Sequence, residues 1–416
     1  MGWLAVARRE LWQRHCPQGL ISWRYLWPGQ DERIIAHRQI WWQQGEGWPR
    51  WLWLAVQGWQ WLRWVGWFGP LALWRTLGRR RAQVAELQGL SQAQELWRVG
   101  GLTLGWCIPP REIYQFHLHH HPERALDYIF TQELPAYHRW RSRPLGLQPA
   151  SLAILQDKLR LAAQLTPLGI ALVPTPHVIP RGWAAPLITY LEPGARLFCK
   201  TRSGNQGRGA FTVWQQASVA GAAGLRGQGF EGKDLADGAA VEAAWQKLCQ
   251  DDDALIQPCL VNHAALEPLG MAGRAITVRY ITAWQQGQIR CLSAVLEVPT
   301  HRAERHHQIL YSLLPLDPAR GRVLPWPHPE RLPQAAREAM TTLELQLPQP
   351  FDLPHWPALV WASHQAQAEF PDLWAIAWDW VITPSGPVLL EGNTGWGTTT
   401  SQIIQGGFLA RGQWSP

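Results

Sequence analysis

The chain has 416 residues, of which 46% are hydrophobic and 17% are charged, so it can bury the cores of two or three domains and is not a disordered chain. Its formal net charge of +7 suits a polyanionic ligand, an anionic membrane surface or nucleic acid. The arginines are scattered and no nucleic-acid-binding motif occurs, which argues against a nucleic-acid partner. The six cysteines have no metal-binding spacing and no cleavable signal opens the chain, so we expect reduced thiols and a cytoplasmic location.

The first 125 residues are dense in tryptophan and arginine and predict a helical N-terminal region. Within it, residues 48–74 are almost wholly apolar, but Gln57, Gln60 and Arg63 recur at intervals of three, which fits an amphipathic helix with a narrow polar stripe. Such a helix either packs inside the protein, which we favour, or lies at a membrane interface. A true membrane span needs about 20 apolar residues and would have to tolerate the arginine near its middle.

Four histidines, at positions 117, 119, 120 and 121, raise the question of a metal site. Adjacent side chains point in different directions on a helix or a strand, so these four cannot all reach one ion. Pro122 then predicts the start of a helix, which makes the histidines its solvated lead-in.

From about residue 150 the pattern becomes mixed α/β. A helix is predicted from Ser151, as its N-cap, to residue 165, and apolar segments typical of strands follow it. A proline-rich stretch at 315–360 predicts a loop with one helix near 334–345. The strand-like segments are 170–173, 197–200, 210–214, 254–257, 275–284, 289–296, 375–383 and 388–391.

A glycine-rich loop joins two of these segments. Lys200 ends the first segment, and Gly204, Gly207 and Gly209 follow within six residues, so backbone N–H groups can turn toward anionic oxygens without Cβ obstruction. The loop predicts a phosphate site or, as the alternative, a hairpin with a flexible tip. A second Gly–Lys segment, 227–233, has no apolar strand before it and no hydroxyl residue after its lysine, so it is not a P-loop.

A second constellation lies near the C-terminus, where two apolar runs flank a Pro-Ser-Gly turn and predict a β-hairpin. If Thr383 faces Pro387 across a three-residue turn, then Asp379 lies opposite Glu391, and Asn393 shares a strand face with Glu391. Two facing carboxylates in apolar surroundings are expected to hold a cation or to share a proton. Three oxygen ligands suit Mg²⁺, and an exposed acidic hairpin edge is the less favoured alternative.

Arg279 lies in a strand-like segment among apolar and β-branched neighbours, so it needs an anionic partner. A nucleotide phosphate, a reacting carboxylate and a structural ion pair remain alternatives at this point.

Together these segments resemble the ATP-grasp superfamily and, within it, the sugar-transfer-associated ATP-grasp proteins, which are similar to α-L-glutamate-ligase-type enzymes. The resemblance covers about residues 110–405 and is most specific at 377–393, which is similar to a Gly-Trp-Asp … Pro-x-Gly-Pro … Glu-Gly-Asn ending with alanine in place of the first glycine. It implies an α+β ATP-grasp fold, in which two α+β lobes clamp ATP, preceded by a Trp-rich helical N-terminal region. The implied divisions are the N-terminal region at 1–125, the first lobe with linking helices at 126–258, and the second lobe with the metal site at 259–416.

The resemblance also implies roles for individual residues. Asp379, Glu391 and Asn393 would ligate Mg²⁺, and Lys158 and Lys200 would bind phosphates of ATP. The mobile loop over the triphosphate would be Ser203, Gly204, Asn205, Gln206, Gly207, Arg208 and Gly209, and the adenine-binding hinge would be Gln257, Pro258, Cys259 and Leu260. Arg279 would bind the γ-phosphate or the acyl phosphate, so Arg279 and Lys200 are the expected catalytic residues.

The implied activity is that of an ADP-forming carboxylate–amine ligase that uses ATP and Mg²⁺ in the modification of polysaccharides or cell-surface sugars. Peripheral contact at the inner membrane face is an alternative that the Trp-rich N-terminal region leaves open. Residues 298–308 depart from the family, which has a segment with Gly and Asp-Asn there, and this segment is expected to border the acceptor site. The alternative function is a membrane-associated binding or scaffold protein with a catalytically degenerate ATP-grasp domain.

Overall fold

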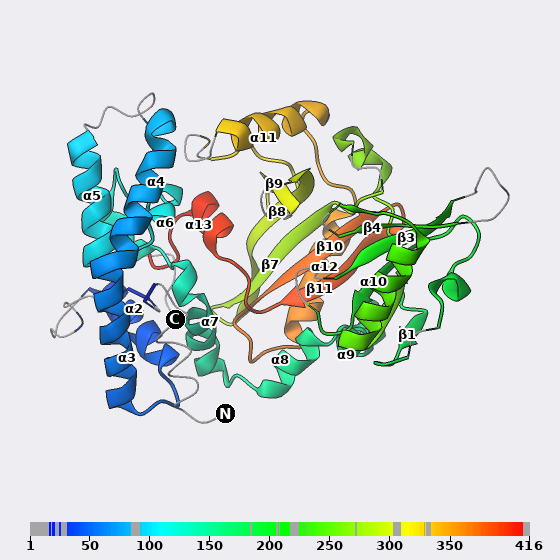
Figure 1. Ribbon diagram of the computed structural model, residues 1–416, viewed down its shortest axis with the longest axis horizontal. Helices are drawn as coiled ribbons and strands as arrows, with labels where there is room; N and C mark the ends of the chain where they lie inside the picture. Colours follow the sequence, from blue (N-terminus) through cyan, green and yellow to red (C-terminus); the bar gives the residue numbers. More distant parts are fainter. Residues whose placement is uncertain are drawn as a thin grey trace. The chain divides into compact units, whose positions relative to one another are not determined.

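In the computed structural model the protein consists of two compact units (Figure 1). Unit 1 contains the tryptophan-rich helices, and unit 2 contains two antiparallel sheets. Unit 1 comprises Met1–Leu147, Pro327–Pro333 and Gly395–Pro416, and unit 2 comprises Gln148–Trp326 and Gln334–Thr394. The structure describes residues 16–17, 19–20, 25, 31–84, 92–183, 185–204, 207, 209–216, 224–230, 232–270, 273–302, 309–327, 329 and 334–410. The division of the chain into lobes at residues 125 and 258 stays a prediction.

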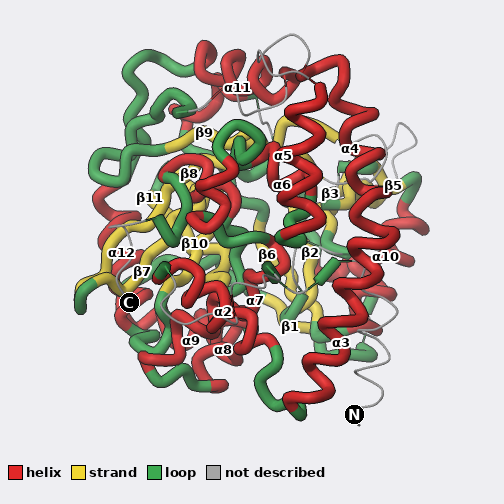
Figure 2. Tube along the Cα trace, turned by 90° about the vertical axis from the view of Figure 1, so that its left-hand side faces the viewer, coloured by secondary structure: helices red, strands yellow, loops and turns green. Residues whose placement is uncertain are grey.

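Unit 1 is helical in its described residues, as the sequence predicts, and Figure 2 colours its helices red. Its helices are α2 (Glu32–Gln44), α3 (Arg50–Arg63), α4 (Gly69–Val84), α5 (Gln92–Gly105), α6 (Pro110–Gln115), α7 (Leu134–Ser142) and α13 (Thr399–Gln405). A π-helical turn, η2 (Trp64–Phe68), joins α3 to α4 without a break, and 3₁₀ turns lie at η3 (Pro122–Asp127), η4 (Thr131–Glu133) and η5 (Arg143–Leu145).

Buried polar pairs tie the ends of unit 1 together. His37 on α2 lies wholly buried with its Nδ1 2.9 Å from Oε1 of Glu133. Gln402 on α13 pairs with both backbone groups of Ile129, because its Oε1 accepts from the amide and its Nε2 donates to the carbonyl, each at 2.8 Å. The C-terminal helix therefore belongs to the same unit as the first helices.

The polar stripe of α3 faces the interior of unit 1. Gln57 and Gln60 are each only 2% exposed, and Gln57 accepts from the indole of Trp41 at 3.3 Å and donates to Gln60 at 3.2 Å. One side of the helix packs through these glutamines together with Trp53 and Val56, and its other side is exposed, so the choice between a packing helix and a helix at a membrane interface stays a prediction. Among the described residues no helix is long and apolar enough to cross a membrane.

Unit 2 contains two sheets in which all neighbouring strands are antiparallel. The six-stranded sheet has the order β1-β6-β2-β3-β4-β5, with β1 (His177–Ile179), β2 (Arg196–Thr201), β3 (Phe211–Gln216), β4 (Gly224–Gly229), β5 (Asp234–Leu235) and β6 (Ala254–Pro258). The five-stranded sheet has the order β11-β10-β7-β8-β9, with β7 (Thr277–Gln285), β8 (Gln288–Arg302), β9 (Ile309–Pro315), β10 (Ala375–Thr383) and β11 (Gly386–Asn393). The helices are α8 (Pro149–Gln156), α9 (Lys158–Leu165), α10 (Gly238–Asp251), α11 (Gln334–Gln346) and α12 (Trp356–Ala368), with 3₁₀ turns η6 (Thr166–Leu168), η7 (Leu187–Tyr190) and η8 (Ala264–Leu269).

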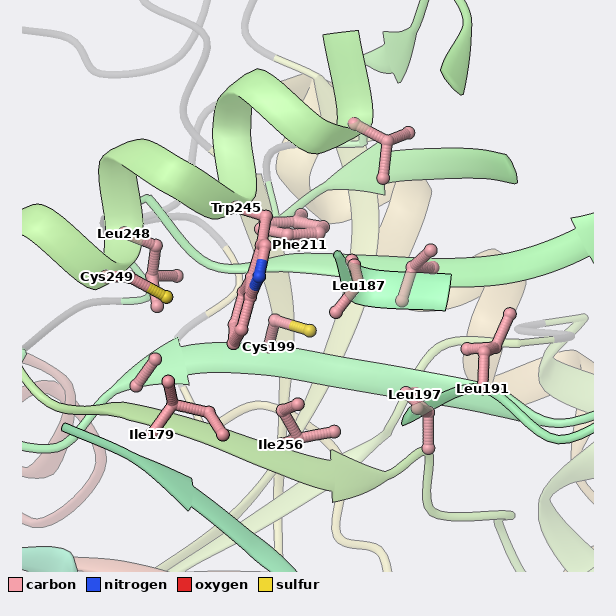
Figure 3. Packing of buried hydrophobic residues seen from close by; sticks show 13 residues of the cluster. Ile179, Leu187, Leu191, Leu197, Cys199, Phe211, Trp245, Leu248, Cys249 and Ile256 are labelled. Atoms are coloured by element: carbon pink, nitrogen blue, oxygen red, sulfur yellow. The ribbon is translucent and has the colours of Figure 1, made fainter. Parts of the chain in front are cut away.

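One face of the six-stranded sheet forms a hydrophobic core under α10 (Figure 3). Leu197 and Cys199 of β2 point into this core together with Phe211 of β3, and Trp245 of α10 fills its centre. Because side chains alternate between the faces of a strand, Lys200 of β2 faces away from the core. The core thereby fixes the direction of the lysine.

The five-stranded sheet is built around β10, whose nine residues are all buried. Such a strand is covered on both faces, which explains its nearly continuous apolar sequence. The indole of Trp378 donates to the hydroxyl of Thr282 on β7 at 2.8 Å, so the neighbouring strands are also joined through their side chains. Asp379 is the only charged residue of β10.

The structure confirms most of the strands and helices expected in unit 2. The expected strands at 197–200, 210–214, 254–257, 275–284, 289–296, 375–383 and 388–391 are present, as is the helix near 334–345. The strand expected at 170–173 is wrong, because only one isolated bridge, between Leu172 and Leu389, forms there.

The single helix expected at 151–165 is also wrong, because it is two helices. Asp157 takes an extended conformation and caps α9 by accepting from the amides of Leu159 and Arg160, at 3.0 and 3.3 Å. Ser151 is not an N-cap, since it lies inside α8 and its hydroxyl donates to Asp372 at 2.8 Å.

The segment around the four histidines differs from its prediction as well. The helix expected at Pro122 is a 3₁₀ turn. His119 is buried, His117 and His120 are half-buried and His121 is exposed, so the solvated lead-in expected from the sequence is wrong for His119. The buried ring of His119 lies tilted against the ring of Tyr114, with 4.9 Å between the ring centres, which makes it part of the helical packing of unit 1.

Candidate active site

Lys200 lies on β2, on the sheet face opposite the hydrophobic core. Burial lowers the pKa of its ammonium group to about 8, and the neighbouring charge of Lys158 acts in the same direction. Glu391 of the other sheet partly opposes this effect. A bound anion would stabilise an ammonium group that is desolvated beside another cation.

Lys158 is the first residue of α9, so the cap formed by Asp157 determines its position. Its Nζ donates to the backbone carbonyls of Arg202, at 3.1 Å, and Gly204, at 2.8 Å. Burial lowers the pKa of Lys158, whereas Glu391 raises it. The second lysine therefore reaches the beginning of the glycine-rich loop and the electrostatic environment of Glu391.

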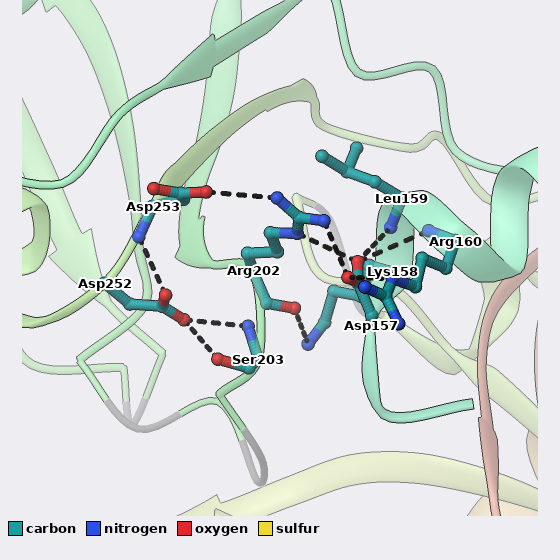
Figure 4. Close-up of polar contacts among 8 residues, drawn as sticks. All are labelled: Asp157, Lys158, Leu159, Arg160, Arg202, Ser203, Asp252 and Asp253. Atoms are coloured by element: carbon teal, nitrogen blue, oxygen red, sulfur yellow. Dashed lines mark hydrogen bonds and ion pairs between the residues drawn. The ribbon is translucent and has the colours of Figure 1, made fainter. Parts of the chain in front are cut away.

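An ion-pair network holds the beginning of this loop (Figure 4). Arg202 donates to Asp157 through two nitrogens, at 2.9 and 2.7 Å, and to Asp253 at 3.1 Å. Next to it, the amide of Ser203 donates to Asp252 at 2.9 Å. Arg202, Asp252 and Asp253 were not predicted from the sequence, although the acidic run before β6 was a usable signal.

Two glycines of the loop are required by geometry. Gly207 has φ +63°, and a Cβ there would overlap the ring of Phe230. Gly209 has φ +72°, and a Cβ there would meet nothing within 4 Å, so only its backbone conformation favours glycine. Asn205, Gln206 and Arg208, which were expected to belong to the loop, lie outside the described residues.

The C-terminal hairpin pairs Asp379 with Glu391, as predicted, but through a different turn. Thr383 pairs with Gly386 across a two-residue turn, so the expected pairing with Pro387 is wrong. A β-bulge after Asp379 adds one residue to β11, which compensates for the shorter turn. The two differences cancel, and the carboxylates face each other.

Around this pair the side chains form a compact polar cluster. The Asn393 amide donates to Asp379 and to Glu391, each at 3.1 Å. Arg279 binds both oxygens of Asp379, at 2.9 and 3.0 Å, and lies 3.0 Å from Glu297. Arg279 thus has the structural ion pair that was one of its three alternatives, and Glu297 was not identified from the sequence.

Burial and charge perturb the acidic groups of the cluster. Burial raises the pKa of Asp379, against the opposing effect of Arg279. Burial likewise raises the pKa of Glu297 to about 7. For Arg279, burial alone lowers the pKa, but the facing Asp379 and Glu297 reverse this and raise it. One guanidinium is therefore shared by two carboxylates in a poorly solvated place.

The donor chemistry of the cluster fits magnesium. Asp379, Glu391 and Asn393 offer carboxylate and amide oxygens, and the asparagine lies within hydrogen-bond distance of both carboxylates. In the described part of the chain no three His, Cys, Asp or Glu side chains form a metal-binding group, so the candidate set depends on the asparagine.

The hinge predicted at 257–260 follows β6. The side chain of Gln257 is buried and donates to Thr175 at 2.7 Å, so it has a structural partner. The amide of Cys259 donates to the carbonyl of Arg196 at 3.1 Å. Pro258, Cys259 and Leu260 are half-buried, which leaves part of the hinge accessible.

The site residues come from both sheets of unit 2. The amide of His263 donates to the carbonyl of Ile382 at 2.7 Å, and Leu172 bridges Leu389 of β11, so segments next to the hinge and α9 contact the C-terminal hairpin. Lys158 and Lys200 accordingly lie within the electrostatic influence of Glu391. Of the departing segment 298–308, residues 303–308 lie outside the described residues.

The fold and this cluster define an ATP-grasp protein. Residues 181–413, more than half of the chain, match the model of the family described as sugar-transfer associated ATP-grasp. The chain belongs to this family, and the α+β ATP-grasp fold expected from the sequence is confirmed. A search of curated proteins finds no match.

Several solved structures resemble the chain at low identity. A D-alanine–D-alanine ligase from Bacillus anthracis complexed with ATP is 14% identical, with a TM-score of 0.33 over 62% of this chain and 60% of that one. D-alanyl-alanine synthetase A from Vibrio cholerae is 10% identical, with a TM-score of 0.33 over 67% and 65%. An L-amino acid ligase from Bacillus licheniformis is 12% identical, with a TM-score of 0.34 over 71% and 55%. The chain thus spans less than two thirds of the length of each of these structures.

Proposed function

We propose that this chain is an ADP-forming ligase that uses Mg-ATP to activate a carboxylate as an acyl phosphate and couples it to an amine or another nucleophile. Membership of an ATP-grasp family supports an ATP-dependent ligase. The observation that carries the proposal is that two half-buried lysines, Lys158 and Lys200, both lie within the electrostatic influence of Glu391. We further propose that the carboxylate or its acceptor belongs to a polysaccharide or a cell-surface sugar.

In this proposal the lysines bind the phosphates. Lys200 lies on a strand of the sheet, and its lowered pKa means that its environment lacks a matching negative charge. A triphosphate supplies that charge and stabilises the ammonium form. Lys158 binds beside it, while Ser203 to Gly209 close over the triphosphate and exclude water. The accessible part of the hinge, Pro258 to Leu260, binds the adenine through its backbone.

Asp379, Glu391 and Asn393 would hold Mg²⁺, which neutralises negative charge that develops on the phosphate oxygens. Arg279 contacts Asp379 directly, so it orients this carboxylate and opposes the rise in pKa that burial causes. Because this contact places its guanidinium beside the ligand set, Arg279 can also neutralise a γ-phosphate or an acyl phosphate. We propose Arg279 and Lys200 as the catalytic residues.

The chemistry requires positioning and charge stabilisation. A substrate carboxylate oxygen attacks the γ-phosphorus in line and ADP leaves, after which an amine attacks the acyl carbon and phosphate leaves. The chain needs no nucleophile of its own for either step, because its cations stabilise the transferring phosphoryl group. A cytoplasmic location is part of the proposal, since ATP is the substrate and the spacing of the cysteines favours reduced thiols. Contact with the inner membrane face would come from unit 1 and not from this site.

The test is release of ADP by the purified chain with ATP, Mg²⁺ and a panel of amino acids and uronic-acid glycans. We expect ADP and phosphate with one acid–acceptor pair, and loss of turnover in Lys200→Ala and Glu391→Ala. Lys247→Ala on the exposed side of α10 is the matched control and should keep full turnover. Release of AMP, or wild-type turnover in either site variant, would refute the mechanism. ATP binding without turnover for every pair would favour the scaffold alternative.

A further inference from the structure

The helix that runs through α3, η2 and the first part of α4 has an unusual surface. From Trp51 to Trp74, every exposed residue is Trp, Leu, Ala, Gly or Pro. Three of the indoles are largely exposed, with 71% for Trp51, 69% for Trp67 and 74% for Trp74. Scattered surface hydrophobics are ordinary, but a continuous series of large ones marks a surface that something covers.

The exposed apolar residues follow the helical repeat. On α3 they include Trp51, Leu54, Trp61 and Leu62, at separations that place them along one stripe of the helix. Trp67, Pro70 and Trp74 continue at intervals of three and four beyond the π-helical turn. We call the set Trp51, Leu54, Trp61, Leu62, Trp67 and Trp74 the tryptophan surface.

This helix differs from an ordinary helix on a water-exposed surface because its outer side is apolar while two of its polar residues are buried. Gln57 and Gln60 are buried and hydrogen-bonded inside unit 1 beside the buried indoles of Trp53 and Trp64, whereas most of the other indoles of the helix face outward. Placing amides inside and indoles outside is unfavourable in water on both counts, since amides lose hydration and apolar area stays exposed. It becomes favourable when the outer surface is in contact with a nonaqueous phase.

Every charged residue of the helix that carries the tryptophan surface is an arginine. Arg50 and Arg75 are exposed and bracket it, and the guanidinium of Arg63 lies 5.0 Å from the ring centre of Phe68 at its middle. The sequence contains no Asp or Glu from residue 47 to residue 85, a stretch that includes six arginines. The complementary surface must therefore be apolar and anionic at once.

We infer that the tryptophan surface binds the interface of an anionic lipid bilayer, with the α3–α4 helix lying along the membrane. Indole rings favour the boundary between headgroups and acyl chains, and arginines beside them pair with anionic headgroups. The surface extends over 24 positions from Trp51 to Trp74. At about 1.5 Å per helical residue this is roughly 36 Å, so an extended, nearly flat partner such as a bilayer can cover all of it.

Flotation with vesicles tests the inference on the full chain. We expect the chain to bind vesicles of phosphatidylcholine and phosphatidylglycerol more tightly than vesicles of phosphatidylcholine alone, and to bind less at high salt. The variant Trp51→Ser/Trp67→Ser/Trp74→Ser should bind the anionic vesicles at least about 100-fold more weakly, because each indole removed forfeits the transfer of a large apolar side chain.

A matched control uses exposed indoles elsewhere. Trp183 and Trp361 are 76% and 51% exposed in unit 2, so Trp183→Ser/Trp361→Ser should bind vesicles like the wild type. An independent variant, Arg50→Gln/Arg75→Gln, keeps the indoles and should lose about tenfold affinity for anionic vesicles only. Thermal melting verifies that each variant is folded. If the triple tryptophan variant does not fold, vesicle binding by the arginine variant tests the inference instead.

Failure to bind anionic vesicles would overturn the inference, and so would unchanged binding by the triple variant. Sedimentation velocity gives the remaining outcome. If the wild type does not bind vesicles but self-associates, and the triple variant is monomeric, a second copy of the chain covers the surface and the lipid inference is wrong. None of these results depends on whether the chain hydrolyses ATP.

Discussion

Lys200 offers a direct test of the electrostatics at the proposed phosphate site. Burial and the neighbouring Lys158 lower its pKa from an ordinary 10.5 to about 8, so the folded protein carries this ammonium at a cost. At about 1.4 kcal/mol for each pKa unit, the difference corresponds to about 3 kcal/mol. Lys200→Met keeps the length of the side chain and removes the charge, so we expect it to raise the stability of the ligand-free protein by up to about 3 kcal/mol at pH 7.

The direction of the pH effect follows from the same shift. Between pH 8 and 10.5 the unfolded chain keeps a proton on Lys200 that the folded chain has lost, so wild-type stability rises with pH in this window. The advantage of Lys200→Met should therefore shrink at about pH 9.5 compared with pH 7. Urea denaturation followed by circular dichroism measures both values, and Lys247→Met on the exposed side of α10 serves as the control.

Isothermal titration calorimetry completes this experiment. We expect Lys200→Met to be more stable than the wild type and yet to lose ATP affinity, which is the signature of a group retained for a ligand and not for folding. A variant that is no more stable than the wild type at pH 7, or an advantage of equal size at both pH values, would refute the reasoning.

Three further predictions concern neighbouring groups. Burial raises the pKa of Glu297 from 4.5 to about 7, so the contribution of this carboxyl to stability falls as pH rises through this range. In urea denaturation, the stability of Glu297→Gln relative to the wild type should therefore rise by up to about 3 kcal/mol between pH 5 and pH 8. Arg202→Ala removes two ion pairs that hold the glycine-rich loop and should raise the Kd for ATP by about tenfold in calorimetry. Arg322→Ala breaks an ion pair elsewhere in the protein and should leave this Kd unchanged. Gly207→Ala brings a Cβ into the ring of Phe230, whereas Gly209→Ala causes only backbone strain of about 1 kcal/mol. Gly207→Ala should therefore weaken ATP binding more, and equal Kd values for the two variants would contradict this.

Sequence patterns predicted the strands well because buried strands carry a strong local signal. β10 (Ala375–Thr383) has the bounds expected from its apolar run. The pairing of Asp379 with Glu391 was also predicted, but the predicted turn was wrong and a bulge restored the pairing. A bulge adds one residue without changing composition, so no local pattern reveals it.

The residues that the sequence did not reveal act through tertiary contacts. The helix break at Asp157 was missed because the apolar spacing continues across it, and only the partner Arg202 shows why the aspartate leaves the helix. Glu297 looks like an ordinary member of an alternating strand until the pairing of β7 with β8 brings it to Arg279. Such residues are found by register, which a single sequence does not specify.

The arrangement around Arg279 connects folding to the proposed chemistry. One guanidinium serves two buried carboxylates, Asp379 and Glu297, at 2.9 to 3.0 Å. Because burial raises the pKa of Glu297, this carboxyl is neutral in a larger share of the molecules near neutral pH than an ordinary glutamate is. In those molecules Arg279 balances Asp379 alone, and one of its nitrogens becomes available to an incoming anion. A neutral Glu297 does not compete with a phosphate for the guanidinium of Arg279. The burial of Glu297 is therefore compatible with the proposed role of Arg279 as a phosphate ligand.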